Sequence, residues 1–109
     1  MTISVNGCSG KTYTFDGPYP NTENLAENSG IYLILCKNNN NNNYNPVDVG
    51  ESHNVKNRVE THDRSNCWSN NCNTQLFVAV LYTPHKQQTG RKEIEQDIRC
   101  NYNFPCGEK

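Results

Sequence analysis

The order of apolar and polar segments predicts a mixed α+β domain. Residues 30–35, 46–50 and 76–82 are apolar runs rich in β-forming residues, which predict strands. Residues 51–64 and 90–100 carry apolar side chains at helical spacing, which predicts helices. The expected order is an N-terminal β-hairpin, then strand, strand, helix, strand, helix. A chain of 109 residues is long enough for one hydrophobic core.

A buried strand is expected at residues 30–35, a short apolar run bounded by a glycine and by a polar tract. Residues 46–50 follow that tract, so the two runs are expected to pair as an antiparallel hairpin. The asparagine run at residues 38–43 lies between them and predicts a mobile, solvated loop. Seven uninterrupted apolar residues, 76–82, predict a central strand covered on both faces. Trp68 is expected to fill the core beneath a short irregular segment.

Residues 1–28 predict a separate β-hairpin and connector, and residues 29–109 the main domain. Residues 3–5 and 12–15 alternate around a glycine-containing turn, which is typical of a hairpin. We expect this arm to cover an exposed sheet edge. A role in choosing a partner or substrate is the alternative.

Charge and hydropathy favour a soluble, cytoplasmic protein. No apolar run approaches the ~20 residues that a membrane helix needs, and the first residues lack a charged region followed by an apolar one. The formal net charge of -1 provides no general attraction to nucleic acid. Any nucleic-acid function must therefore depend on a local basic patch.

The six cysteines have two possible structural uses besides that of free thiols. They are Cys8, Cys36, Cys67, Cys72, Cys100 and Cys106. Without a secretory signal, reduced thiols are the expected state, and a disulfide framework is the alternative. The closest spacings, 67 to 72 and 100 to 106, are wider than those of usual zinc pairs. Cys36 and Cys100 fall in apolar-patterned segments and are expected to be small buried hydrophobic residues.

The first predicted helix, residues 51–64, carries two polar side chains on its apolar side. Val55 and Val59 define that side at i, i+4 spacing. Arg58 and His62 lie three and seven residues after Val55, so both are expected to face the protein. Such an inward arginine requires a carboxylate or a phosphate.

Two carboxylates are candidate partners for Arg58, namely Asp48 and Glu95. In the second predicted helix, Glu95 lies at the boundary of the apolar side and itself needs a cation. That cation is expected to be Arg58, Arg91 or a metal ion.

Taken together and in this order, these motifs resemble the GIY-YIG nuclease family over residues 29–107. The likeness lies in Gly30-Ile31-Tyr32, in Val49-Gly50-Glu51-Ser52 with Arg58 leading to His62, and in Arg91 with Glu95 running to Pro105-Cys106. It implies a three-stranded antiparallel sheet flanked by helices. It also implies metal-dependent endonuclease activity, with nucleic acid, expected to be DNA, as the partner and one Mg²⁺ or Mn²⁺ ion as the cofactor.

The resemblance implies a role for each of four residues. Tyr32 would position or deprotonate the attacking water, and Arg58 would hold the scissile phosphate. His62 would assist proton transfer, and Glu95 would bind the metal. Because histidine titrates closer to neutral pH than tyrosine, His62 is also a competing general base.

Two positions depart from the family pattern. Asp48 replaces the tyrosine of the second motif, and Gly107 replaces an asparagine. Asp48 is a candidate catalytic residue, as a second metal ligand or alternative base; a salt bridge to Arg58 would instead describe a non-catalytic domain. The alternative functions are therefore a degenerate GIY-YIG fold that binds nucleic acid or protein, and a small structural protein that depends on its cysteines. The binding module would need no metal and would use the basic residues Lys56, Arg58, Arg64, Arg91, Lys92 and Arg99.

Overall fold

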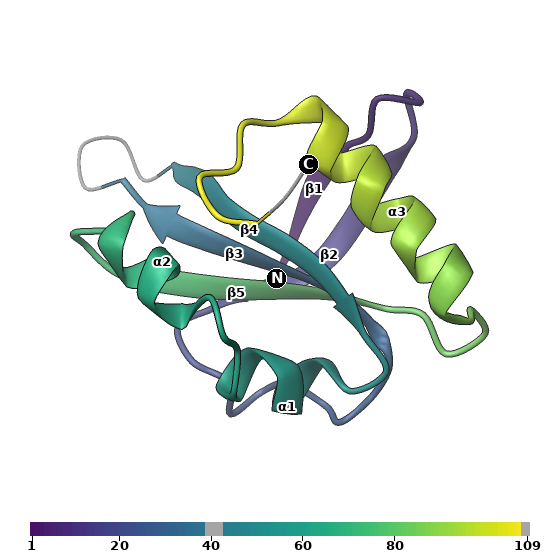
Figure 1. The fold of residues 1–109 in the computed structure, drawn as a ribbon, viewed down its shortest axis with the longest axis horizontal. Coiled ribbons are helices and arrows are strands. Elements are labelled where there is room, and N and C mark those ends of the chain that lie inside the picture. Colours follow the sequence, from purple (N-terminus) through teal and green to yellow (C-terminus); the bar gives the residue numbers. More distant parts are fainter. Residues whose placement is uncertain (39–42, 108–109) are drawn as a thin grey trace.

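The computed structural model describes residues 1–38 and 43–107, and within them five strands form one antiparallel sheet (Figure 1). The strands are β1 (Thr2–Asn6), β2 (Thr12–Tyr19), β3 (Gly30–Lys37), β4 (Tyr44–Ser52) and β5 (Leu76–Tyr82). Their order across the sheet is β1-β2-β5-β3-β4. The helices in the described residues are α1 (Val55–Glu60), α2 (Ser65–Asn70) and α3 (Gln88–Asn101).

The α+β class and the hairpin of β3 and β4 are confirmed, but the sheet is larger than expected. The N-terminal hairpin of β1 and β2 joins the same sheet, because β2 pairs with β5 and places Asp16 opposite Val80. Phe15 of β2 is fully buried in the core. The arm thus satisfies the hydrogen-bonding edge of β5, which would otherwise be open. The sheet accordingly has five strands within the described residues rather than three.

Strand β3, which lies between β5 and β4, is apolar up to Cys36 because helices cover both of its faces. Ile31, Leu33 and Leu35 belong to the core cluster that includes Ile94 and Ile98 of α3. The alternate residues Tyr32, Ile34 and Cys36 belong to the cluster that includes Val55 of α1 and Trp68 of α2. This alternation follows from the two-residue period of a strand. Figure 1 shows α3 on one side of β4 and the two short helices on the other.

A β-bulge in β4 separates neighbouring side chains of that strand. Ile34 lies opposite Asp48, whereas Leu35 lies opposite Pro46, so Val47 is an extra residue. Val47 packs in the cluster beside α1 and α2, and Val49 packs in the cluster beside α3. Asp48, between them on the edge strand, can therefore reach residues from both helical layers.

The segment predicted as one helix over residues 51–64 forms a shorter helix and a turn. Asn54 caps α1, and its side chain accepts a hydrogen bond from Asn57 N at 3.1 Å. The chain leaves the helix before His62, whose ring accepts the backbone N–H of Arg64. Trp68 is buried as expected, but in α2 rather than in an irregular segment.

The expectation of reduced cysteines is wrong. The structure pairs Cys8 with Cys100, Cys36 with Cys72 and Cys67 with Cys106. Each pair joins segments that only the tertiary fold brings together, such as the β1–β2 turn and the end of α3. Cys100 is also exposed rather than buried.

Two further expectations concern the polar loop and the membrane. The predicted mobile loop falls largely on residues 39–42, which lie outside the described residues. Of the helices in the described part of the chain, none is long and apolar enough to span a membrane.

The disulfides make stability sensitive to reduction. The Cys8–Cys100 bond closes a loop with a sequence separation of 92 residues. In the chain-entropy account, removing it by Cys8→Ser with Cys100→Ser costs about 4 kcal/mol of unfolding free energy, measured by urea titration. Thiol titration of the denatured, unreduced protein should detect no free cysteine. Six titratable thiols there would contradict the pairing.

Candidate functional site

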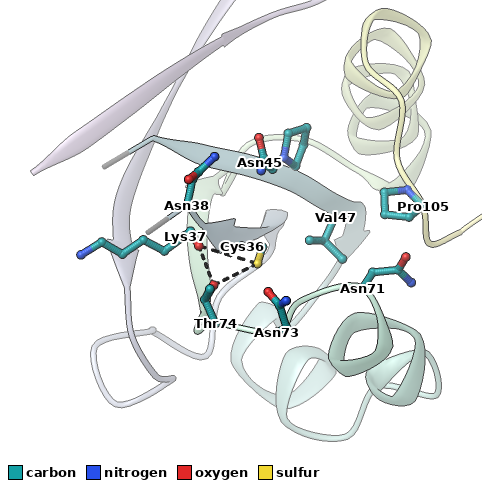
Figure 2. Close-up of a pocket in the computed structure, with 10 residues that line it drawn as sticks. Cys36, Lys37, Asn38, Asn45, Val47, Asn71, Asn73, Thr74 and Pro105 are labelled. Carbon is teal, nitrogen blue, oxygen red and sulfur yellow. Dashed lines mark hydrogen bonds between the residues drawn. The ribbon is translucent and has the colours of Figure 1, made fainter. Parts of the chain in front are cut away.

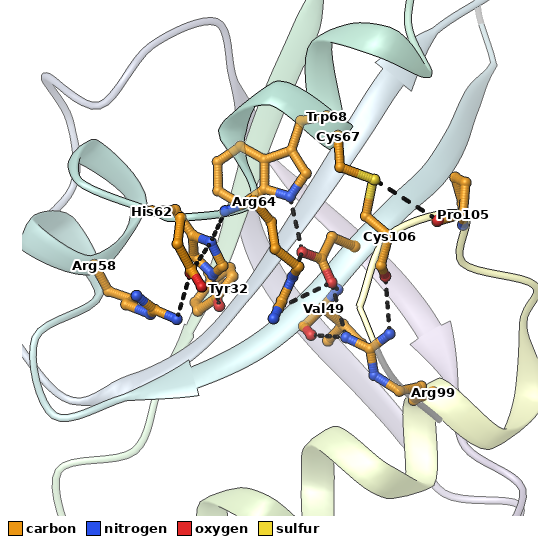
Figure 3. Close-up of polar contacts among 12 residues, drawn as sticks. Tyr32, Val49, Arg58, His62, Arg64, Cys67, Trp68, Arg99, Pro105 and Cys106 are labelled. Atoms are coloured by element: carbon orange, nitrogen blue, oxygen red, sulfur yellow. Dashed lines mark hydrogen bonds and ion pairs between the residues drawn. A yellow bond between two sulfur atoms is a disulfide. The ribbon is translucent and has the colours of Figure 1, made fainter.

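Asp48 of β4 is a fully buried carboxylate. Figure 3 shows three of its neighbours, Arg64, Trp68 and Arg99, pointing toward one another. Asp48 Oδ2 accepts hydrogen bonds from Arg64 Nε and Trp68 Nε1, both at 2.8 Å. Its Oδ1 accepts from Arg99 Nη2 at 2.8 Å and from Val49 N at 2.9 Å. Two guanidinium groups thus compensate one buried charge and hold it by hydrogen bonds. The lone pairs of Asp48 are already used within the protein.

The C-terminal segment closes over Arg99. Arg99 Nη1 donates to Cys106 O at 3.0 Å, and the guanidinium carbon lies 5.3 Å from the centre of the Phe104 ring. Gly107 has a φ of +93°, and a Cβ there would lie 2.6 Å from Arg99 Nη1 and 2.8 Å from Asp48 Oδ1. Both the conformation and the lack of space require glycine. The position therefore cannot hold an asparagine without moving this network.

A polar cavity of about 610 Å³ lies beside the arginine network. It is lined by Asp63, Arg64, Lys92, Glu95, Gln96, Arg99 and Gly107. Three of these side chains are cationic and two are carboxylates. Of the residues predicted to form the site, only Glu95 lines this cavity.

Glu95 is the carboxylate in this cavity that the protein leaves least satisfied. Its side chain is 19% exposed, and its ion-pair partner among the described residues is Arg99, whose Nε lies 3.8 Å from Oε2. That distance is too long for a hydrogen bond, and Arg99 Nε has no other partner in the described structure. Burial raises the pKa of Glu95 above its usual value. Arg91, a predicted partner, instead binds Glu51 at 2.9 Å.

Tyr32 and His62 form a buried pair outside the described lining of the cavity. The Tyr32 hydroxyl lies 2.5 Å from His62 Nε2, and the backbone N–H of Arg64 donates to Nδ1 at 3.0 Å. Burial raises the pKa of Tyr32 to about 12 and lowers that of His62 to about 4. Both side chains are therefore neutral at neutral pH. A Cβ at Gly50 would lie 2.1 Å from the Tyr32 hydroxyl, so this pair also depends on a glycine.

Arg58 lies apart from the predicted carboxylates. Its side chain is 39% exposed and binds Asp63 at 3.1 Å. Asp48 and Glu95, the two expected partners of Arg58, both pair with Arg99 instead. Asp48 also pairs with Arg64.

The carboxylates of the described residues fit a lightly coordinated divalent cation rather than a protein cage. Within residues 1–38 and 43–107, no group of three His, Cys, Asp or Glu side chains could hold a metal ion. Mg²⁺ commonly binds through one or two carboxylates and substrate phosphates while keeping several waters. Glu95, facing an open polar cavity, fits that mode of binding, whereas the saturated Asp48 does not.

A second cavity, of about 530 Å³, lies near the β3–β4 hairpin (Figure 2). Its polar side chains are mainly amides, including Asn45, Asn71 and Asn73, and its cation is Lys37. Thr74 Oγ1 donates to Lys37 O at 2.5 Å on its wall. This cavity has no carboxylate among its described lining residues, which makes it less suited to a metal.

Sequence reasoning placed Arg64 and Arg99 only in the general basic set of a binding module, and it assigned neither of them to the site around Asp48 and Glu95. Arg99 had a detectable signal, since Arg91, Glu95 and Arg99 follow one another at i, i+4 and i+8 along α3. Arg64 had none, because it lies in the turn after α1 and reaches the cavity only through the tertiary fold.

No family model, curated protein or solved structure matches this chain. The site geometry and the sequence motifs are therefore the basis for a functional proposal.

The neutral, buried His62 makes stability depend on pH. Its pKa is about 4 in the folded protein against 6.5 ordinarily, so the unfolded chain binds more protons between these values. The contribution of the neutral His62 to the free energy of unfolding is complete above pH 6.5. It falls as the pH drops toward 4, by about 3 kcal/mol at most. Urea unfolding across this range should show a shallower pH dependence for His62→Gln than for wild type. The exposed His53→Gln is the control, and equal slopes for all three proteins would contradict the prediction.

Proposed function

We propose that the protein binds the phosphodiester backbone of nucleic acid, expected to be DNA, at the cavity beside α3 and hydrolyses it with one Mg²⁺ or Mn²⁺ ion held at Glu95. The observation that carries this proposal is the state of Glu95. This carboxylate is largely buried, lines a polar cavity and has its ion-pair partner Arg99 beyond hydrogen-bonding distance. A cation at Glu95 would supply the missing interaction.

The charges around Glu95 suit a phosphate together with a cation. Arg64, Lys92 and Arg99 line the cavity and favour an anionic group. For phosphate binding alone, a carboxylate on the same wall would be unfavourable, because like charges repel. A site for both a phosphate and a divalent cation makes use of both signs of charge.

The residues of the chain would act by binding and by charge. A bound divalent cation supplies Lewis-acid stabilisation of the negative charge that develops on the phosphate. Lys92 and the cavity arginines stabilise the same charge electrostatically. Asp63 also lines the cavity, and a hydrogen bond from its own backbone lowers its pKa. It stays ionised at neutral pH, so it adds negative charge to the cavity, and its lowered pKa does not suit a general base.

Nucleic-acid binding without hydrolysis is the second candidate function, and one observation favours it. Tyr32 and His62, to which the GIY-YIG resemblance assigns proton transfer, are buried outside the cavity lining and bonded to each other. With pKa values of about 12 and 4, neither is tuned to exchange a proton near neutral pH. Asp48, the third candidate, is saturated by its two arginines. These facts support a domain that binds nucleic acid at this surface and does not hydrolyse it.

Cleavage assays separate the two candidates. Labelled duplex, branched and single-stranded DNA and RNA are incubated with Mg²⁺ or Mn²⁺ and with wild type, Glu95→Gln or Glu93→Gln. Glu93→Gln is the matched control, because Glu93 is an exposed carboxylate on the same helix and lines a different cavity. We expect metal-dependent cleavage that Glu95→Gln slows by about 100-fold or more, and that Glu93→Gln leaves unchanged.

Cleavage that survives Glu95→Gln would contradict the assignment of Glu95. Binding by wild type without cleavage of any substrate would favour the second candidate.

A further inference from the structure

We infer that the phosphate-binding arginine of this site is Arg64, positioned by Asp48, and that Arg58 does not fill this role. The inference takes from the proposed function only that the ligand is a nucleic-acid phosphate. It does not require hydrolysis or a bound metal.

The guanidinium of Arg64 is bound along one edge and available along another. Its Nε and Nη2 bind Asp48 at 2.8 and 3.3 Å. A guanidinium has five N–H groups in a fixed plane, so the two bonds to Asp48 leave three N–H groups. The side chain is 31% exposed and lines the cavity of about 610 Å³. The remaining donors suit a two-pronged contact with phosphate oxygens.

Asp48 and His62 fix Arg64 at both ends. Asp48 is fully buried and is itself held by Arg99 and Trp68, so it cannot follow a moving arginine. At the backbone, the N–H of Arg64 donates to His62 Nδ1 at 3.0 Å. A side chain held in this way loses less conformational freedom when it binds a ligand. Asp48 is therefore a positioning residue for Arg64.

The surroundings of Arg58 are different. Its Nη2 binds Asp63, whose side chain is 76% exposed, at 3.1 Å. Arg58 is absent from the described lining of the cavity that holds Glu95. Its contact is a surface ion pair, which fixes the geometry of a side chain only weakly.

Equilibrium binding tests this assignment separately from catalysis. A short fluorescein-labelled DNA duplex is titrated with each protein in EDTA, and anisotropy is recorded over a series of salt concentrations. Arg64→Gln should weaken binding about tenfold and lower the magnitude of the log K against log salt slope by about 1, because one phosphate contact is lost. The matched control Arg58→Gln should leave affinity and slope close to those of wild type.

Arg64→Lys and Asp48→Asn test the positioning. Arg64→Lys keeps the charge and therefore the slope, but it loses the planar fork and should bind several-fold more weakly than wild type. The same comparison is then made in an Asp48→Asn background that circular dichroism shows to be folded. There, the difference in DNA-binding affinity between arginine and lysine at position 64 should largely disappear. If Asp48→Asn does not fold, the DNA-binding affinities of Arg64→Lys and Arg58→Lys are compared. The assignment requires weaker binding for Arg64→Lys and unchanged binding for Arg58→Lys.

The opposite pattern would overturn the inference: a lower slope for Arg58→Gln with an unchanged slope for Arg64→Gln. Absence of binding by wild type would also overturn it. Binding that depends on Arg64, in a protein that cleaves none of the substrates, would contradict hydrolysis alone and leave this assignment standing.

Discussion

The buried charge of Asp48 is the constraint on which the polar half of the structure depends. A carboxylate with no exposure is tolerated only because Arg64 and Arg99 compensate it and Trp68 donates a further hydrogen bond. These partners come from the α1–α2 turn, from α3 and from α2. Arg99 in turn binds Cys106 O, which fixes the C-terminal segment. One side chain thus joins both helical layers across the edge strand β4.

This arrangement divides the acidic residues of the site into two classes. Asp48 is saturated and organises the arginines, whereas Glu95 faces the cavity with its ion-pair partner at 3.8 Å. The same arginines therefore serve two purposes. They compensate Asp48 inside the protein, and they line the polar cavity at which we propose that phosphate binds. Because the formal net charge is -1, the proposed binding of nucleic acid depends on this local arrangement and not on the charge of the whole chain.

Elements with a strong apolar pattern were predictable from the sequence, and contacts between distant segments were not. The strand at 76–82 has the predicted limits, because its seven apolar residues need cover on both faces. The inward position of His62 also followed from helical spacing, although α1 ends before it. Arg64 and Arg99 lie 16 and 51 residues from Asp48, so no local pattern links them to it. The disulfide pairs escaped prediction for the same reason, since spacing along the chain does not report distance in the fold.

The most direct test of the central role of Asp48 is the free energy of unfolding of Asp48→Asn, measured by urea titration beside Asp63→Asn. Both changes remove one carboxylate charge that pairs with an arginine, but Asp48 is buried and Asp63 is exposed. Asp48→Asn leaves the buried Arg99 with only the more distant Glu95, at 3.8 Å, as its anion and should cost about 3–5 kcal/mol. Asp63→Asn should change stability little. Similar, small effects of the two variants would contradict the account.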